Sequence, residues 1–287
     1  MKKILVPVSL LTLLAFSGPI LAQPTAPGDG MGGQHRAKVL AIEGASPGEA
    51  DAWEKINRMT DIDNKGKEAL EYLEKYPEGA YLPYVHGILA MYYQSKEDEA
   101  RFIEHAELAL QSLPDEVNLL AALSVTYAEK QKPDPAIKYG KTALAILPTA
   151  GAPQGMSTTK WEEIRTKLIA DCNYGAGTGY LFKAFNLGGA DYLMTPAMNH
   201  LQEATRLDPV NQASQFYLGF GYELKEDFES AIPCYAKAAA LKGKNTALAK
   251  QQLENAYKKV HGNTKGVDKL ISEQKKLFEA AAADTGE

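Results

Sequence analysis

The stretch YLGFGYELKEDFESA, residues 217–231, contains the pattern that decides the fold. At 3.6 residues per helical turn, Leu218, Gly219 and Tyr222 share one stripe of a helix. Because Gly219 has no side chain, a second helix can come close to that stripe. From Ala231 onwards, small and large residues alternate at helical spacing, so they can interlock with the first helix. The stretch therefore predicts two antiparallel helices joined by a short turn.

The same pattern returns at a fixed period. Its first motif, a leucine followed by a small residue and a tyrosine, begins at Leu89, Leu123 and Leu218. Proline closes two consecutive units at Pro114 and Pro148, which are 34 residues apart. One helix pair cannot cover its own apolar face, whereas stacked pairs cover one another. The period therefore predicts an array of helix pairs, and no segment alternates in the way that a strand would.

These motifs resemble the tetratricopeptide repeat (TPR), whose pattern is W-x2-L-G-x2-Y, then A-x3-F, then a closing proline. The resemblance covers most of the chain after residue 49. It implies an all-α, right-handed α-solenoid of stacked antiparallel helix pairs, a TPR superhelix, behind an N-terminal signal and a flexible leader. The residues that match the packing positions of the family are Leu89, Tyr93, Leu123, Tyr127, Ala136, Gly140, Ala143, Ala197, Ala204, Leu218, Gly219, Tyr222, Ala231, Tyr235 and Ala238.

Composition and turn residues divide the chain into six expected segments. The stretch before residue 49 is rich in Gly, Pro, Ala and Gln and cannot bury enough apolar area to order itself. The segments are a signal peptide (1–22), a flexible linker (23–48), an N-terminal helix-pair cap (49–82), two TPR units (83–150), two further TPR units of which the first is irregular (151–245), and C-terminal capping helices with a tail (246–287).

The first residues have the layout of a bacterial secretory signal. Lys2 and Lys3 precede an apolar run, and Ala22 provides a small residue before a cut at Gln23. The alternative is a membrane anchor, but the apolar run is shorter than the roughly 20 residues that span a bilayer. We therefore expect an exported protein, periplasmic or secreted, that meets a membrane only through envelope partners.

The irregular unit has a long first helix, expected from Thr159 to Asn186. Thr159 and Glu162 have the spacing of a capping box at its start. Gly177 and Tyr180 are the best matches to the small residue and the tyrosine of the motif. This alignment predicts an insertion around residues 186–195, before the second helix.

No motif in the sequence indicates catalysis, phosphate binding or metal binding. Asp61 begins a calcium-loop-like run, but its twelfth position is Tyr72 in place of a bidentate glutamate, so a helix–helix turn is expected. The glycines of residues 175–179 lack the strand and the Gly-Lys-Ser/Thr of a phosphate loop, so we expect close helix packing. Cys172 and Cys234 either pair in an oxidising compartment or are small buried side chains. The histidines lack metal-ligand spacing, and we predict no enzyme, metal or cofactor.

The formal net charge of −5 and the pI near 5.7 exclude the usual basic nucleic-acid binder. In the TPR family, the first helices of successive units line a concave groove that binds a peptide or a helix. Mapped residue by residue, the resemblance implies an apolar groove with acidic edges and without the cationic clamp of the chaperone-binding members. The candidate groove residues are Met91, Gln94, Asn118, Val125, Glu129, Phe216, Phe220 and Glu223.

Phe216 and Phe220 are the expected anchors for an apolar peptide, with packing against the neighbouring unit as the alternative. The sequence thus predicts a non-catalytic scaffold or adaptor for a protein or peptide partner of unknown identity. A self-associating structural protein of the envelope is the second hypothesis, which the polar terminal helix disfavours. An enzyme would need a clustered polar pocket, for which the region from Trp161 to Tyr180 is the place to look.

Overall fold

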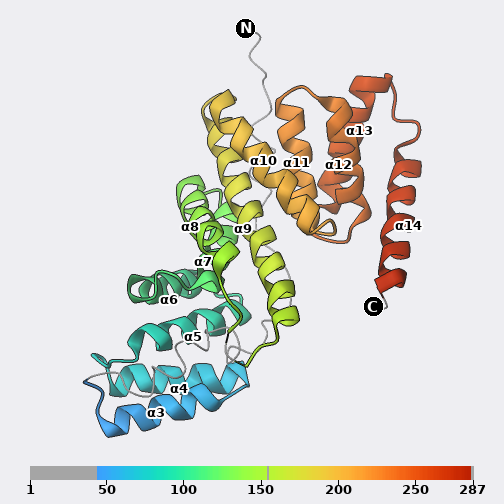
Figure 1. Cartoon of the computed structure of the whole chain (residues 1–287). Coiled ribbons are helices and arrows are strands. Elements are labelled where there is room, and N and C mark those ends of the chain that lie inside the picture. Colours follow the sequence, from blue (N-terminus) through green and yellow to red (C-terminus); the bar gives the residue numbers. More distant parts are fainter. Residues whose placement is uncertain (1–43, 154, 286–287) are drawn as a thin grey trace.

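A computed structural model of the chain describes residues 44–153 and 155–285 (Figure 1). Within these residues the protein has twelve α-helices, one short 3-10 helix and no strand. The predicted signal peptide and most of the predicted linker lie outside the described residues. The α-helices are α3 (Pro47–Arg58), α4 (Ile62–Lys75), α5 (Leu82–Ser95), α6 (Glu99–Ser112), α7 (Val117–Glu129), α8 (Pro133–Ile146), α9 (Thr158–Asn186), α10 (Asp191–Leu207), α11 (Gln212–Leu224), α12 (Phe228–Ala240), α13 (Thr246–His261) and α14 (Val267–Thr285).

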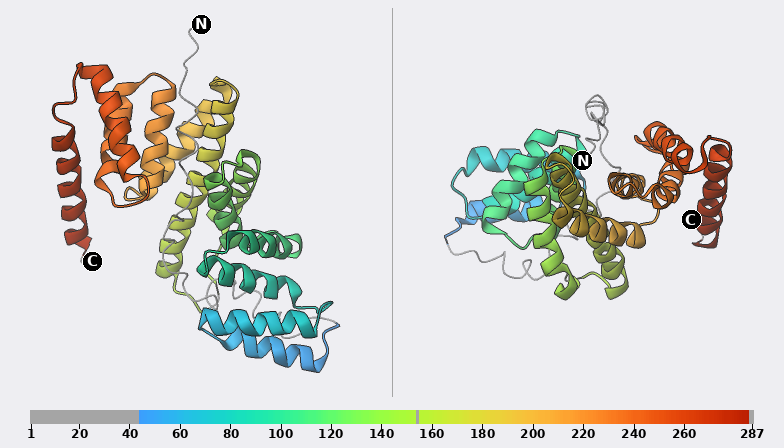
Figure 2. Two further views of the ribbon diagram at one scale, coloured as in Figure 1. Left: turned by 180° about the vertical axis from the view of Figure 1, so that it is seen from behind. Right: turned by 90° about the horizontal axis from the view of Figure 1, so that it is seen from above.

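Successive helices form antiparallel pairs that stack into a curved array (Figure 1). The pairs α5–α6, α7–α8 and α11–α12 consist of helices of 13 or 14 residues. Seen from above, the N-terminal and C-terminal pairs lie on the two sides of the long helix α9 (Figure 2). The predicted all-α solenoid of stacked helix pairs is confirmed. Among the described helices, none combines the length and the apolar character needed to cross a membrane.

The three regular pairs share one turn between their helices. Glu97, Gln131 and Glu226 occupy the left-handed region in these turns, with φ of 57°, 54° and 58°. The following amide donates to the carbonyl of the motif tyrosine, which is the long bond of a Schellman motif. These bonds join Asp98 to Tyr93 (2.9 Å), Lys132 to Tyr127 (2.9 Å) and Asp227 to Tyr222 (3.0 Å). The tyrosine of each repeat therefore also marks where its helix ends.

The same turn also ends α9. There the Gly189 amide donates to the Ala184 carbonyl over 2.8 Å, so Ala184 stands where the regular units have tyrosine. Three residues earlier, Leu181 stands where they have a small residue. The turn thus lies one helical turn beyond Tyr180, but the packing follows the predicted match. Gly177 faces Leu201 of α10, as Gly219 faces Tyr235 of α12, and Leu201 lies one 34-residue period before Tyr235. Helix α9 therefore keeps the motif at Gly177 and Tyr180 and continues one turn past it.

The boundaries of the irregular pair refine the sequence prediction. The link between α9 and α10 is only residues 187–190, and α10 has 17 residues where α12 has 13. The predicted insertion around residues 186–195 is therefore present and is mostly helical, since it lengthens the end of α9 and the start of α10. Ser157, rather than Thr159, caps α9, since its hydroxyl accepts from the Lys160 amide over 3.2 Å.

The ends of the array follow the predicted turns. Asp61 caps α4 by accepting from the Asn64 amide over 2.9 Å, which confirms a helix–helix turn in place of a calcium loop. Helix α13 ends at His261, and Gly262 follows it with a φ of 76°. Helix α14 packs against α12 and closes the C-terminal end (Figure 1).

Two apolar cores run through the array, and α9 contributes to both. Trp161 and Cys172 belong to the core of the N-terminal pairs. Tyr174 and Leu181 belong to the core of the C-terminal pairs. The long helix is therefore the joint between two halves that each bury their own side chains.

The glycines of α9 make this joint possible. Gly175, Gly177 and Gly179 face three different helices, and a methyl group on any of them would meet backbone. The nearest backbone atoms to such a methyl carbon are the Ser124 carbonyl carbon at 2.8 Å from Gly175, the Leu201 nitrogen at 3.0 Å from Gly177 and the Pro133 oxygen at 3.0 Å from Gly179. Close helix packing, as predicted, accounts for the glycine-rich stretch.

Candidate interaction surface

We call α3, α5, α7, α9 and α11, the first helices of the pairs, the first-helix row. Aromatic side chains join α3 to α5 and α9 to α11, and α5 and α7 share the N-terminal core. Trp53 of α3 lies 5.6 Å from the Tyr84 ring of α5. Further along, Phe182 of α9 lies 5.5 Å from Tyr217 of α11. Helix α7 packs directly on α9. The row therefore crosses the joint between the two cores.

Two of the predicted groove residues belong to the core. Val125 and Phe216 are each only 4% exposed. The Phe216 ring lies 5.3 Å from Tyr217 and 5.7 Å from Tyr235, on its own helix and on the partner helix. The expectation that Val125 and Phe216 line a groove is thus corrected: they pack the units together, which was the alternative for Phe216.

The two predicted acidic edges have partners within the protein. Glu129 at the end of α7 pairs with Lys244 over 3.1 Å. Glu223 on α11 accepts from the Tyr235 hydroxyl over 2.5 Å. Burial raises the pKa of both carboxyl groups, and the ammonium of Lys244 opposes that rise at Glu129. These acids hold the array in shape and are not free charges for a partner.

The Glu129–Lys244 pair links helix pairs that are not neighbours in the stack. Lys244 lies in the turn between α12 and α13, whereas Glu129 ends the first helix of the unit before α9. The turn itself is held by Gln212, whose amide donates to the carbonyls of Ala238 and Leu241, each over 3.0 Å. The end of α7, in the middle of the first-helix row, is therefore held in place by the turn between α12 and α13.

The other predicted groove residues stay partly accessible. Met91 and Phe220 pack at the edges of the two cores, and Phe220 lies 5.8 Å from the Phe185 ring of α9. The Asn118 amide donates to the Glu116 carboxylate over 2.9 Å. Gln94 lies half-exposed at the end of α5. Met91, Gln94 and Phe220 are thus the predicted residues that a partner can reach along the row.

The predicted packing residues lie at the contacts between helices. Tyr127 and Tyr222 are half-buried, and their hydroxyls bond to Glu107 and Gln202 on neighbouring second helices, over 2.7 and 2.9 Å. The remaining packing residues are buried, namely Leu89, Tyr93, Leu123, Ala136, Gly140, Ala143, Ala197, Ala204, Leu218, Gly219, Ala231, Tyr235 and Ala238.

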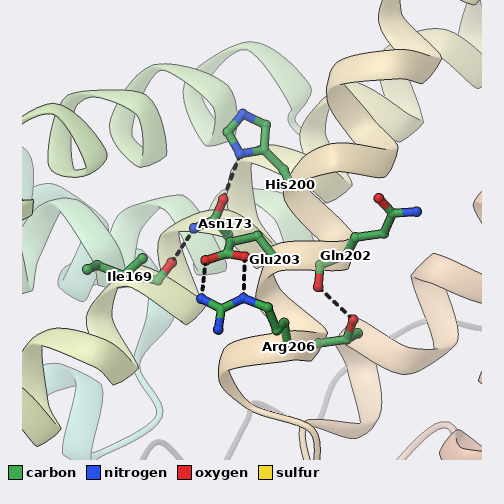
Figure 3. A network of polar contacts seen from close by, with 7 residues as sticks. Ile169, Asn173, His200, Gln202, Glu203 and Arg206 are labelled. Carbon is green, nitrogen blue, oxygen red and sulfur yellow. Dashed lines mark hydrogen bonds and ion pairs between the residues drawn. The ribbon is translucent and has the colours of Figure 1, made fainter.

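Polar residues gather between α9 and α10 (Figure 3). Asn173 donates to the Ile169 carbonyl over 2.8 Å, and its amide oxygen lies 2.8 Å from His200 Nδ1. Tyr180 stacks on the His200 ring at 5.9 Å. Burial lowers the pKa of His200, which keeps the ring neutral. The network satisfies the side chains of Asn173 and His200, whereas Thr178 Oγ1 of α9 is buried without a hydrogen-bond partner among the described residues.

The polar and thiol side chains of the Trp161–Tyr180 region have structural roles. Trp161 donates its indole N–H to the Ala150 carbonyl over 2.9 Å. Asp171 is 7% exposed and lies 3.6 Å from Lys167. Cys172 and Cys234 are unpaired, and burial raises the pKa of both thiols, which makes them poor nucleophiles. In the described part of the chain no three His, Cys, Asp or Glu side chains come together as a metal site.

One contact escaped the sequence analysis. His86 of α5 and His105 of α6 stack at 5.1 Å, and their Nδ1 atoms are 2.9 Å apart, so one nitrogen donates to the other. Tyr93 covers the other face of His105 at 5.3 Å. Burial lowers the pKa of both rings. The two residues are 19 apart in the sequence, so only an alignment of both helices of the unit could have paired them.

Comparisons with known proteins give only distant likenesses. No protein-family model and no curated protein sequence matches the chain. The crystal structure of MamA protein aligns over 71% of this chain and 91% of its own, with 21% identity and a TM-score of 0.44. PilW, a widely conserved type IV pilus biogenesis factor, aligns over 82% and 94%, with 14% identity and a TM-score of 0.49. Yeast Tom70 aligns over 74% of this chain but only 40% of its own, with 17% identity and a TM-score of 0.49.

These overall similarities are low, so the assignment rests on the helix pairs themselves. The repeat of 34 residues, the shared Schellman turn and the buried small–large contacts recur in the regular pairs. By these features the chain is a TPR-like helical repeat protein.

Proposed function

We propose that this protein is a non-catalytic interaction scaffold that holds a peptide or a helix of another protein along its first-helix row. The observation that carries the proposal is the continuity of that row, which passes through α9 from one core to the other. A continuous helical surface offers one extended site, whereas separate loops would offer isolated contacts. Helical repeat arrays commonly bind partners on such extended surfaces.

Two features support binding on this surface. Met91 and Phe220 leave part of their apolar side chains accessible, and partly exposed apolar groups of this kind serve as anchors for a helix or peptide. The ion pair between Glu129 and Lys244 braces the row before a partner arrives. A braced surface loses less conformational entropy on binding, which favours affinity.

We also propose that the protein acts outside the cytoplasm. The positively charged start, the apolar run and the small residue at Ala22 support export and cleavage before Gln23. Mass spectrometry of the protein recovered from its native host should find Gln23 as the first residue. A protein that retains Met1 and remains with the cytoplasmic fraction would contradict this part of the proposal.

The binding surface is tested with substitutions along the row. Met91→Lys and Gln94→Lys place charge on accessible positions of α5, where a partner would have to bury it. We expect each to weaken capture of the partner from an envelope extract by roughly tenfold, because an uncompensated buried charge is costly. Quantitative mass spectrometry of the captured proteins gives the measurement.

A matched control comes from the second helices. Thr142 is exposed on α8, and its hydroxyl bonds only to the Lys138 carbonyl of the same helix. Thr142→Lys adds the same charge on the other side of the array and should leave capture unchanged. Equal capture by all variants, with unchanged melting temperatures, would show that the row is not the binding surface.

A further inference from the structure

Charge is distributed unevenly along the chain. Residues 47–116 carry sixteen acidic and seven basic side chains, a net charge of −9, and we call this segment the acidic end. Residues 237–276 carry ten lysines and three acidic side chains, a net charge of +7, and we call this segment the basic end. The formal charge of −5 for the whole chain conceals both. Such asymmetry is a feature of surfaces that meet a charged partner.

Much of this charge is exposed and not neutralised within the protein. On the acidic end, these side chains are exposed and form no ion pair among the described residues: Asp51, Glu71, Glu74, Glu78, Glu97 and Glu104. On the basic end, the same holds for Lys242, Lys258, Lys259, Lys265, Lys275 and Lys276. Each end therefore has charges available to an outside partner.

The two ends cannot neutralise each other within one molecule. Helices α3 and α4 lie at one extreme of the array and α13 and α14 at the other, with α9 between them (Figure 1). Where the two ends come closest, Glu99 pairs with Lys130 and Lys244 pairs with Glu129, so these charges are already neutralised. The Debye length at physiological salt is about 8 Å, so the charges on the terminal helices α3, α4 and α14 act independently and attract opposite charge from solution.

We propose that the protein associates head to tail with a second copy of itself, the acidic end of one molecule docking on the basic end of the next. The charge complementarity of the two ends argues for this occupant, since the molecule itself provides the surface that each end requires. The polar surface of α14, which disfavours apolar self-association, supplies lysines for it. A contact between two different surfaces does not close on itself as a two-fold dimer does, so it generates chains or rings.

This assembly goes beyond the proposed scaffold function, because it would increase the number of binding surfaces in one particle. Met91 and Gln94 lie on α5 within the acidic end, but a head-to-tail contact on α3, α4 and α6 leaves them accessible, and Phe220 lies outside both ends. An assembly would then present several rows at once, which raises the effective concentration of binding sites without any new contact to the partner. Failure of the assembly leaves partner capture by a single molecule unaffected, so the two proposals are tested separately.

Charge-swapped variants test the assembly. The first variant reverses the six unpaired charges of the acidic end, whose net charge goes from −9 to +3: Asp51→Lys, Glu71→Lys, Glu74→Lys, Glu78→Lys, Glu97→Lys and Glu104→Lys. The second reverses the six unpaired charges of the basic end, whose net charge goes from +7 to −5: Lys242→Glu, Lys258→Glu, Lys259→Glu, Lys265→Glu, Lys275→Glu and Lys276→Glu. All twelve side chains are exposed, so the variants should fold. Light scattering should find that the unaltered protein grows in mass with concentration at about 20 mM salt and is monomeric at about 500 mM salt. Each variant alone should associate at least roughly tenfold more weakly.

The decisive measurement mixes the two variants. One now has only basic ends and the other only acidic ends, so the mixture should form equimolar complexes that neither forms alone. A chain that carries all twelve substitutions should recover self-association, because its ends again have opposite charge. Lys141→Glu on α8, which is exposed and outside both ends, is the control and should behave as the unaltered protein does.

Three outcomes would overturn the proposal. The unaltered protein could stay monomeric at low salt at every concentration. It could associate with no response to the swaps or to mixing. Finally, the basic end could bind vesicles with anionic headgroups or a polyanion while the protein remains monomeric, and the lysines would then serve another macromolecule.

Discussion

The regular pair α11–α12 and the long pair α9–α10 end their first helices in the same turn but use small residues differently. In α11, Gly219 faces the ring of Tyr235, a side chain of its own partner helix. In α9, Gly175, Gly177 and Gly179 face the backbone of three separate helices. The glycines of the regular pair thus meet side chains of their neighbours, whereas those of the long helix meet the backbone of three neighbours.

This difference explains why the long pair departs from the repeat. Of the regular first helices, α7 gives only Val125 to the C-terminal core, whereas α9 gives large side chains such as Trp161 and Leu181 to the two cores. A helix surrounded on several sides needs small residues on several faces, so a single small position in a motif cannot describe it. Comparing the two pairs therefore predicts where substitutions are tolerated and where they are not.

The largest effect is expected for Gly175→Ala. The added carbon would lie 2.1 Å from Ser124 Oγ and 2.8 Å from the Ser124 carbonyl carbon, so α7 and α9 would have to separate. We expect a loss of about 3 kcal/mol in the free energy of unfolding from overpacking, reduced by about 1 kcal/mol because alanine favours helix more than glycine. Denaturant titration followed by circular dichroism measures the change.

Gly221→Ala is the matched change in the regular pair. Its added carbon would meet the Met198 sulfur at 2.4 Å, which is near the end of a flexible side chain that can move away. The free energy of unfolding should stay within about 1 kcal/mol of the unaltered protein. If both glycines tolerate alanine equally, the distinction between backbone and side-chain contacts fails.

The next largest effect concerns the buried acid of the long pair. Burial raises the pKa of Asp171 to about 6, and nearby Asp208 adds to the rise while Lys167 opposes it. As pH rises, the unfolded chain releases this proton first, so the protein should lose stability between about pH 4 and pH 6. A shift of about two units corresponds to roughly 3 kcal/mol at most. Asp171→Asn should remove this dependence.

At pH 7 the asparagine variant should gain about 1 kcal/mol, since the loss of the contact to Lys167 offsets part of the relief. Thermal melts at pH 4, 5, 6 and 7 measure the slope. Asp191→Asn, an exposed change at the start of α10, is the control and should keep the slope of the unaltered protein. A variant at Asp171 with an unchanged slope would mean that this carboxyl is not the group responsible.

The smallest effect is expected in the regular pair, for Tyr235→Phe. The lost hydroxyl donates to Glu223 over 2.5 Å and leaves that half-buried carboxylate without its partner. We expect a loss of about 1 kcal/mol in the free energy of unfolding. Tyr222→Phe removes a hydroxyl that bonds only to exposed Gln202, and its cost should be below about 0.5 kcal/mol. Equal costs would show that the burial of Glu223 does not matter.

The regular pairs were predictable from sequence because local chemistry and packing agree in them. Leu89, Leu123 and Leu218 begin the same motif, and each lies buried in the core. In α9 the motif at Gly177 and Tyr180 is kept, but the helix continues one turn beyond it, and α10 is also longer than α12. This extra length meets a tertiary demand, the need to fit three neighbours, which no local pattern reveals.

The candidate surface was predicted less well than the fold. Family positions located the first helices, but whether a side chain faces solvent depends on how far the array curves. Val125 became buried because α9 packs directly on α7, and Glu129 found Lys244 more than a hundred residues away in the sequence. The sequence of a single unit does not reveal such long-range contacts, because its motif reflects only packing within the unit and against adjacent units.

The length of α9 has a mechanical consequence. An array of equal short helices can bend slightly at every contact between neighbouring pairs. Helix α9 has 29 residues and is therefore about 43 Å long, so it forms a long stiff element in the middle of the array. A force on the ends of the molecule would therefore bend it mainly at the contacts of α9 with the helix pairs on its two sides. The N-terminal and C-terminal halves would rotate relative to α9, while α9 itself keeps its shape.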